Sequence, residues 1–263
     1  QHGTAIVVGA AIFNAMRLVG KNLEDCKIVS TGGGAAGIAC LNLLIDMGAK
    51  RENIWLIDRT GLVYDGREAD AQKAAFAQPS DARVLDDVID GADIFLGLSG
   101  PGVLKADQVV RMATSPLILA LANPDPEILP EDVLAVRSDA IIATGRTDYP
   151  NQVNNVLCFP FIFRGALDVG ATEINEAMKV ACVEAIASLT HEGASDEVAQ
   201  AYGGQSLVFG PEYILPKPFD SRLLVSIAPA VAKAAMDTGV ATKPIADLEA
   251  YRVDLSRFVN RDR

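Results

Sequence analysis

The sequence predicts an α/β fold, a doubly wound parallel sheet with helices on both faces and a helical C-terminal extension. Short apolar runs recur along roughly the first 150 residues, without the polar alternation typical of half-exposed strands. Helix-like or turn-rich stretches separate these runs. Strands that are apolar throughout and that alternate with helices belong to parallel sheets covered on both faces.

The individual elements of the first part follow from local composition. Residues 4–19 are almost wholly apolar and predict a helix that is buried on most sides. Residues 36–47 have helical periodicity, which stops at Gly48. The expected strands are residues 27–31, 53–58, 92–99, 116–122 and 140–144.

The second part of the chain has a different pattern. Residues 151–169 and 173–189 predict two long helices. Residues 191–222 are rich in Gly and Pro and show little periodicity, so they predict a long connection before a helix over 223–238. We assign 1–190 to one domain and interpret 191–263 as a long loop and helical extension of that domain.

Composition bounds the class of protein. Half of the 263 residues are hydrophobic and 22% are charged, which is enough for a sizeable core. The net charge of −11 disfavours a nucleic-acid or acidic-membrane partner. No basic-then-apolar leader or long uncharged run is visible, so we expect no membrane partner and a cytoplasmic location. The scattered cysteines, without CxxC spacing, predict reduced thiols: Cys26, Cys40, Cys158 and Cys182.

A glycine cluster follows the first expected strand and opens the next helix. It satisfies the GxGxxG pattern, in which the first glycine allows a tight turn, the second lets a diphosphate approach the backbone, and the third permits close helix–strand packing. Free N–H groups at the helix start would face the negative charge. The pattern predicts a dinucleotide-binding turn made of Gly32, Gly33, Gly34, Ala35, Ala36 and Gly37.

An acidic residue supports this hypothesis. Asp58 ends the next strand about twenty residues further on, where a carboxylate would accept hydrogen bonds from an adenosine ribose. Asp58 alone favours NAD, because it would repel a 2′-phosphate, but the adjacent Arg59 could neutralise one. The sequence therefore predicts a Rossmann-type NAD(P)-binding domain and leaves the choice between NAD and NADP open.

Several further motifs resemble the malic enzyme family. The match covers essentially residues 1–260. Residues 159–168 resemble the bacterial form of the family. Residues 209–213 and 223–240 resemble its large subtype, in which a phosphotransacetylase-like C-terminal domain follows. The segments that carry the family resemblance are Gln1-His2-Gly3-Thr4-Ala5, Gly97-Leu98-Ser99-Gly100-Pro101-Gly102, Ala120-Leu121-Ala122-Asn123-Pro124-Asp125-Pro126-Glu127 and Asp148-Tyr149-Pro150-Asn151-Gln152-Val153-Asn154-Asn155.

The resemblance implies a reaction and some of its residues. The family oxidises L-malate with NAD(P)+ and releases CO2 to give pyruvate, with Mg2+ or Mn2+ polarising the C2 oxygen. Asn123 would contact substrate or the nicotinamide riboside, and Ser99 and Gly100 would lie near the nicotinamide. Asn155 would contact the malate carboxylate, and Asn154 is the adjacent candidate. Turn formation at Asn123 and helix capping at Asn154 or Asn155 are the structural alternatives.

The resemblance also implies what this chain lacks. The family's catalytic Tyr and Lys and its metal ligands lie upstream of Gln1, and the abrupt start in an apolar helix suggests a chain entered midway. No catalytic residue or metal ligand is therefore expected here, and we expect coenzyme binding without turnover. We interpret Asp148 and Tyr149 as pocket wall or structure, and we expect Asp86 and Asp87 to lie on a surface helix.

Two alternatives stay open. The chain could be the cofactor domain of another two-domain dehydrogenase, although nucleotide binding alone does not demand the segments 120–127 and 148–155. It could also be a stand-alone NAD(P)-binding regulatory module, although its first helix lacks the usual cap and lead-in. Family members are oligomeric, so the resemblance implies a homo-oligomer for the full-length enzyme.

Overall fold

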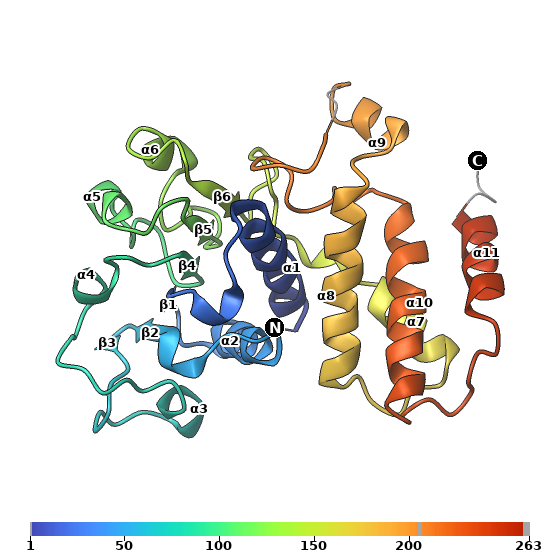
Figure 1. Cartoon of the computed structure of the whole chain (residues 1–263), viewed down its shortest axis with the longest axis horizontal. Helices are drawn as coiled ribbons and strands as arrows, with labels where there is room; N and C mark the ends of the chain where they lie inside the picture. The colour runs from blue at the N-terminus through green and yellow to red at the C-terminus, as the bar shows by residue number, and fades with distance from the viewer. Residues whose placement is uncertain (1, 205–206, 260–263) are drawn as a thin grey trace. The chain divides into compact units, whose positions relative to one another are not determined.

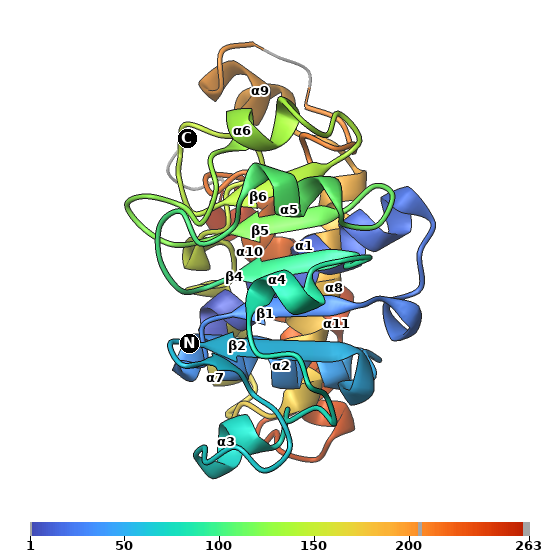
Figure 2. The same cartoon turned by 90° about the vertical axis from the view of Figure 1, so that its left-hand side faces the viewer.

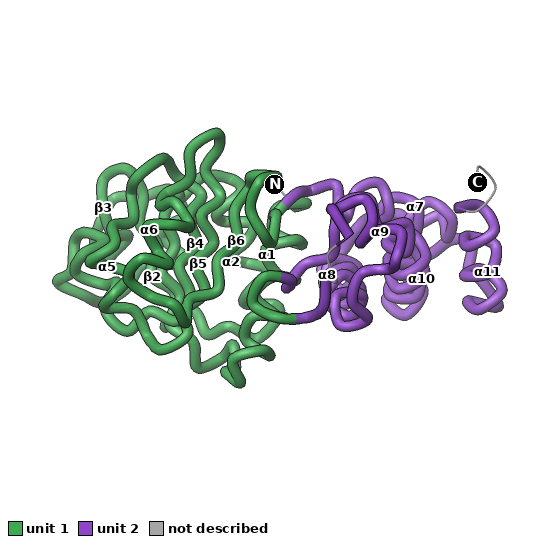
Figure 3. The backbone as a smooth tube through the Cα atoms, turned by 90° about the horizontal axis from the view of Figure 1, so that it is seen from above, with its two compact units in different colours: residues 1–153, 210–212 green, residues 154–209, 213–263 purple. Residues whose placement is uncertain are grey.

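The computed structural model describes residues 2–204 and 207–259. The chain divides into two compact units, one made of residues 1–153 with 210–212 and the other of 154–209 with 213–263 (Figure 3). The predicted end of the nucleotide-binding domain, residue 190, lies within the last turn of a helix of the second unit. Compactness does not measure independent folding, so the division 1–190 and 191–263 stays a prediction.

The first unit contains a six-stranded sheet of order β3-β2-β1-β4-β5-β6. All neighbouring strands pair in parallel except β2 and β3, which are antiparallel. The central β1 lies between β2 and β4, so the chain reverses its direction of travel across the sheet there. The strands are β1 Ile28–Thr31, β2 Ile54–Asp58, β3 Gly61–Leu62, β4 Ile94–Gly97, β5 Leu117–Ala120 and β6 Ile141–Thr144.

Helices cover both faces of this sheet (Figure 2). On one face, α1 (His2–Val19) contacts α2 (Ala35–Asp46) and β5. Shorter helices cover the other face, where they pack on Val29, Phe95 and Ile118 of the three central strands. The shorter helices of this unit are α3 Ala71–Ala74, α4 Leu85–Val88, α5 Ala106–Val110 and α6 Pro130–Leu134, with 3-10 turns η1 Leu23–Asp25 and η2 Arg51–Asn53.

Helix α1 is apolar because it is a core helix. Its 18 residues are long and apolar enough to cross a membrane by length and composition, but 67% of them are buried inside the protein. Burial on most sides removes the need for a polar face, which explains the nearly continuous apolar sequence.

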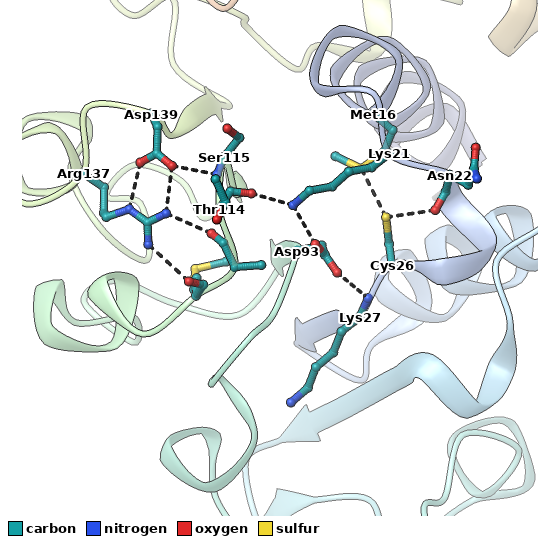
Figure 4. Close-up of polar contacts among 12 residues, drawn as sticks. Met16, Lys21, Asn22, Cys26, Lys27, Asp93, Thr114, Ser115, Arg137 and Asp139 are labelled. Carbon is teal, nitrogen blue, oxygen red and sulfur yellow. Dashed lines mark hydrogen bonds and ion pairs between the residues drawn. The ribbon is translucent and has the colours of Figure 1, made fainter.

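Charged side chains fasten the amino ends of the strands, at the edge opposite to the glycine turn (Figure 4). Lys21 Nζ lies 2.6 Å from Asp93 Oδ1, and Asp93 Oδ2 accepts a hydrogen bond from Lys27 N at 2.9 Å. Lys27 and Asp93 directly precede β1 and β4. Nearby, Arg137 donates to Asp139 and to backbone carbonyls of the loop that leads into β5. These contacts link the segments that lead into neighbouring strands at the amino edge of the sheet.

The second unit is helical. Helix α10 packs against α7, α8 and α11, and α8 and α10 lie side by side in Figure 1. The expected helix over 151–169 is wrong as a single element: a 3-10 turn precedes a helix that begins only after Pro160, whose ring removes a backbone donor. The elements are η3 Asn155–Leu157, α7 Phe161–Asp168, α8 Glu176–His191, α9 Asp196–Ala201, α10 Arg222–Asp237 and α11 Leu248–Val259.

Candidate functional site: the carboxyl edge of the sheet

The carboxyl ends of five strands lie in register at one edge of the first unit. Thr31 of β1 pairs with Ile57 of β2 and with Gly97 of β4, and Gly97 pairs with Ala120 of β5. The loops after these residues contain the predicted glycine turn, Asp58, Ser99 and Asn123. In open parallel sheets, ligands bind at this edge, where the strand order reverses. The fold therefore brings the predicted coenzyme residues to one place.

Two glycines of the turn are required by its geometry. Gly32 has a φ of +107°, and a Cβ there would lie 2.3 Å from the carbonyl oxygen of Leu98. At Gly37, a Cβ would lie 2.0 Å from the carbonyl oxygen of Gly32, so only glycine lets α2 start this close to β1. The first and third positions of the pattern thus have the structural roles that the sequence predicted.

The fold does not require glycine at position 34. Gly34 precedes α2 with φ −82° and ψ 179°, a conformation that any residue adopts. A Cβ there would meet no atom within 4 Å. The residue is exposed and faces open space at the start of the helix, where the first N–H groups have no acceptor within the helix. Glycine therefore leaves position 34 without a side chain, and this is where a bound diphosphate would approach the backbone.

The carboxylate of Asp58 is held by neighbours of its own chain. Oδ1 accepts hydrogen bonds from the Thr60 N–H and hydroxyl, both at 2.9 Å, and from Arg67 Nη2 at 2.6 Å. Burial alone would raise the pKa of Asp58, but the hydrogen bonds from Arg67 and Thr60 outweigh it and lower the pKa to about 2. Asp58 is therefore ionised, and its Oδ1 already accepts three hydrogen bonds.

Two cations that sequence reasoning missed lie beside Asp58. Arg67 donates through Nη1 to the carbonyls of Gly61 at 2.9 Å and Leu62 at 2.8 Å, which fixes the guanidinium against β3. Lys73 Nζ lies 3.6 Å from Asp58 Oδ2. By contrast, in the described part of the chain Arg59 is exposed and forms no ion pair. No motif pointed to these cations, because Arg67 lies in a loop after β3 and Lys73 in the four-residue helix α3, and neither segment is long enough to show a periodic pattern.

A buried carboxylate, also missed, joins the loops after β4 and β5. Glu127 is 0% exposed. Its Oε1 accepts from Ser99 N at 2.8 Å, and its Oε2 accepts from Ala122 N at 3.0 Å. A Cβ at Gly97 would lie 2.5 Å from Glu127 Cδ, so the glycine at the end of β4 makes room for this carboxylate. Glu127 thereby holds the two loops on which the predicted nicotinamide residues lie.

The side chains of Ser99 and Asn123 in those loops are exposed and polar. The Ser99 hydroxyl donates to Thr31 Oγ1 at 2.9 Å, which links the ends of β4 and β1. Gly100 has open space where a Cβ would be. Among the residues that the structure describes, the Asn123 amide hydrogen-bonds to the Leu121 carbonyl alone, at 3.5 Å, so its hydrogen-bonding groups stay largely available. All three residues lie in loops at the carboxyl edge of the sheet.

Asn154 and Asn155 belong to the second unit. Asn154 caps η3, because its Oδ1 accepts from Val156 N at 3.1 Å, which is the structural alternative considered for it. Asn155 is exposed, and its carbonyl accepts from the N–H groups of Cys158 and Phe159. A shared pocket of Asn154 or Asn155 with Asn123 stays a prediction.

The other candidates considered for catalysis or metal binding are engaged elsewhere. The Tyr149 hydroxyl donates to Glu131 Oε2 at 2.9 Å, and Arg146 Nη2 donates to Asp148 at 2.6 Å. Asp87 accepts from Arg83 N and Val84 N, whereas Asp86 pairs with Arg111. Within residues 2–204 and 207–259, no group of three or more His, Cys, Asp or Glu could hold a metal ion.

Comparison with known proteins identifies the family. The model for the malic enzyme NAD binding domain matches residues 1–201. The chain belongs to the malic enzyme family. An NAD-dependent malic enzyme of Rhizobium meliloti (strain 1021) is 62% identical over 99% of this chain. An NADP-dependent malic enzyme of Salmonella typhimurium (strain LT2) is 63% identical over 98% of it.

The malic enzymes differ from this chain in length. It covers 34% of each of these two relatives, so it spans about a third of their length. The crystal structure of the malic enzyme from Pyrococcus horikoshii Ot3 matches with a TM-score of 0.86 and 32% identity, over 99% of this chain and 59% of that one. The chain is therefore similar to the NAD-binding part of a malic enzyme, and the Rossmann-type fold is confirmed. Relatives of almost equal similarity carry both coenzyme names, so similarity does not decide between NAD and NADP.

Proposed function

We propose that this chain binds NAD+ or NADP+ across the start of α2, as the cofactor-binding part of an enzyme that converts L-malate to pyruvate and CO2. When bound, the coenzyme supplies the hydride acceptor. The chain's own residues bind and orient it: the turn 32–37 receives the diphosphate, and Asp58 with its neighbours faces the adenosine ribose.

The observation that carries this proposal is the empty space at Gly34. Gly32 and Gly37 are explained by the fold itself, whereas neither backbone conformation nor packing explains glycine at position 34. A diphosphate that approaches the N–H groups at the start of α2 would need this space. The proposal therefore depends on a feature that a purely structural glycine turn would not have.

For the substrate side, we propose that Ser99, Gly100 and Asn123 lie beside the nicotinamide and that Asn123, Asn154 and Asn155 contact malate. Amides suit this role because they donate and accept hydrogen bonds without titrating. The family resemblance implies Mg2+ or Mn2+, but the described side chains do not form a metal site by themselves. The proposal therefore assigns no metal ligand and no metal-dependent step to this chain.

We further propose a cytoplasmic location and a homo-oligomeric full-length enzyme. All four cysteines are buried thiols outside any disulfide. Burial raises the pKa of Cys26 to about 11 and that of Cys40 to about 12, so these thiols are protonated and unreactive at neutral pH. Buried reduced thiols fit a reducing compartment.

Calorimetric titration with each coenzyme tests the binding proposal. We expect saturable one-to-one binding of at least one coenzyme. An absence of heat and of protection against thermal unfolding by either coenzyme would contradict the proposal.

We also expect no malate turnover by the 263-residue chain alone. Tyr149 and Asp148 are engaged with Glu131 and Arg146, and the buried carboxylate of Glu127 accepts from two backbone N–H groups. The chain would be incubated with L-malate, Mn2+ and both coenzymes, while reduced nicotinamide and pyruvate are measured. Metal-dependent pyruvate formation would contradict this expectation.

A further inference from the structure

The buried carboxylate of Glu127 has hydrogen-bond partners but no counter-ion among the described residues. It is 0% exposed. Its Oε1 lies 2.8 Å from Ser99 N and 3.4 Å from the Ser99 hydroxyl oxygen, and its Oε2 lies 3.0 Å from Ala122 N. All of these groups are uncharged, and no lysine or arginine of residues 2–204 and 207–259 pairs with this carboxylate. Burying a charge without an opposite charge is costly, so a role for the charge itself is worth seeking.

The sheet topology puts this carboxylate on the side of the glycine turn opposite to Asp58. The turn follows β1, Asp58 ends β2 on one side of β1, and β4 and β5 lie on the other side. Glu127 joins the loops after β4 and β5. A dinucleotide whose diphosphate lies on the turn has one nucleoside on each side of β1. With the adenosine ribose at Asp58, the nicotinamide would face the loops that Glu127 joins.

A carboxylate on this side distinguishes the two redox forms of the coenzyme. The oxidised nicotinamide ring carries a positive charge, which hydride transfer removes. A nearby negative charge therefore attracts the oxidised ring and has little effect on the reduced one. Water and salt screen this attraction weakly, because Glu127 is fully buried and its Cδ lies only 2.5 Å from the place of a Cβ at Gly97, the last residue of β4.

From these contacts, we propose that the charge of Glu127 makes the chain bind the oxidised coenzyme more tightly than the reduced one. This inference rests on the proposed function, because it requires the dinucleotide at the glycine turn. Glu127 would thereby help to bind the form that the reaction consumes and to release the form that it produces. The two forms differ only in the nicotinamide ring, so the ratio of their dissociation constants reports on the surroundings of that ring.

The experiment measures this ratio by calorimetry, with the oxidised and reduced forms of whichever coenzyme binds the 263-residue chain more tightly. We expect the wild type to bind the oxidised form at least about threefold more tightly than the reduced form. Glu127→Gln keeps the size of the side chain and removes its charge. It should shift the ratio toward the reduced form by about fivefold or more.

Two further variants separate the charge of Glu127 from its link between the loops. Loss of the link alone would weaken both redox forms equally and leave their ratio unchanged. Glu127→Asp keeps the charge on a shorter side chain, so it should weaken both forms and retain the wild-type preference for the oxidised one. Glu131→Gln removes a charge from an exposed position four residues further on and should change the ratio by less than about twofold.

The outcomes separate this inference from the proposed function. If neither coenzyme binds the wild type in either redox form, the proposed function fails. If a coenzyme binds but the wild type takes the reduced form as tightly as the oxidised one, the coenzyme site stands and the inference about Glu127 is overturned. A folded Glu127→Gln chain with the wild-type ratio overturns it as well. The wild-type measurement needs no variant, so it decides the question even if Glu127→Gln does not fold.

Discussion

At the scale of single residues, Glu127 and Asp58 show how buried or partly buried carboxylates organise the carboxyl edge of this sheet. Glu127 accepts from the N–H groups of Ser99 and Ala122, which lie at the starts of two different loops. One oxygen of Asp58 accepts hydrogen bonds from both Thr60 and Arg67. These contacts depend on how irregular loops fold back on themselves, which no periodic pattern encodes. Sequence patterns therefore predicted Asp58 as an acidic partner but gave no sign of the cations around it.

Glu127→Gln should destabilise the chain. Glutamine offers one acceptor and one donor group, so one of the two backbone N–H groups would face another donor in a buried place. We expect a loss of about 1–3 kcal/mol in the free energy of unfolding and faster hydrogen exchange at Ser99 or Ala122. Glu131→Gln, on the exposed partner of Tyr149, should cost less than about 0.5 kcal/mol. Equal effects of the two substitutions in urea unfolding would argue against the role of Glu127.

The pH dependence of stability should report on Asp58. Its folded-state pKa of about 2 lies below its usual value of 3.8, because Arg67 and Thr60 stabilise the ionised form. Ionised Asp58 therefore contributes stability that is fully present above about pH 4 and is lost as the pH falls through about 2. Asp58→Asn should lose stability relative to the wild type above this window, with the difference shrinking inside it. Asp65→Asn, at an exposed carboxylate of the same segment, is the control; a constant difference for Asp58→Asn would contradict the assignment.

At the scale of elements, the turn between β1 and α2 combines positions that serve the fold with one that does not. The sequence predicted the five parallel strands, to within two residues at each end, because a strand buried on both faces is apolar throughout. It missed β3, whose two residues are too short for any period to appear. It also missed the break before α7 and the short α9, since local caps at Asn154 and Ser195 and the ring of Pro160 decide them.

Two glycine substitutions in this turn should separate binding from folding. Gly34→Ala adds a methyl group in open space, so stability should change by less than about 0.5 kcal/mol. Its coenzyme affinity should fall by about tenfold or more, because the methyl group would occupy the approach to the helix start. Gly37→Ala places a Cβ against the Gly32 carbonyl and should destabilise the chain by about 1–3 kcal/mol or more. Thermal unfolding and calorimetry measure the two effects; a Gly34→Ala chain that binds normally would remove the main support for the site.

At the scale of the whole molecule, the predicted site residues belong to two different compact units. The residues of the coenzyme site up to Asn123 belong to the first unit, and Asn154 and Asn155 to the second. A sequence can place residues at strand ends, since parallel strands end at a common edge. It does not encode in any local pattern how the two units meet, so the predicted malate contacts depend on the family resemblance.

The central claim is that the turn 32–37 binds the coenzyme diphosphate, and backbone NMR of the chain titrated with NADP+ and NAD+ tests it most directly. We expect the amide signals of Gly34, Ala35 and Ala36 to shift most strongly and to saturate with the same dissociation constant that calorimetry gives. Saturation of the chain by a coenzyme while these amides keep their free-state positions would contradict the account.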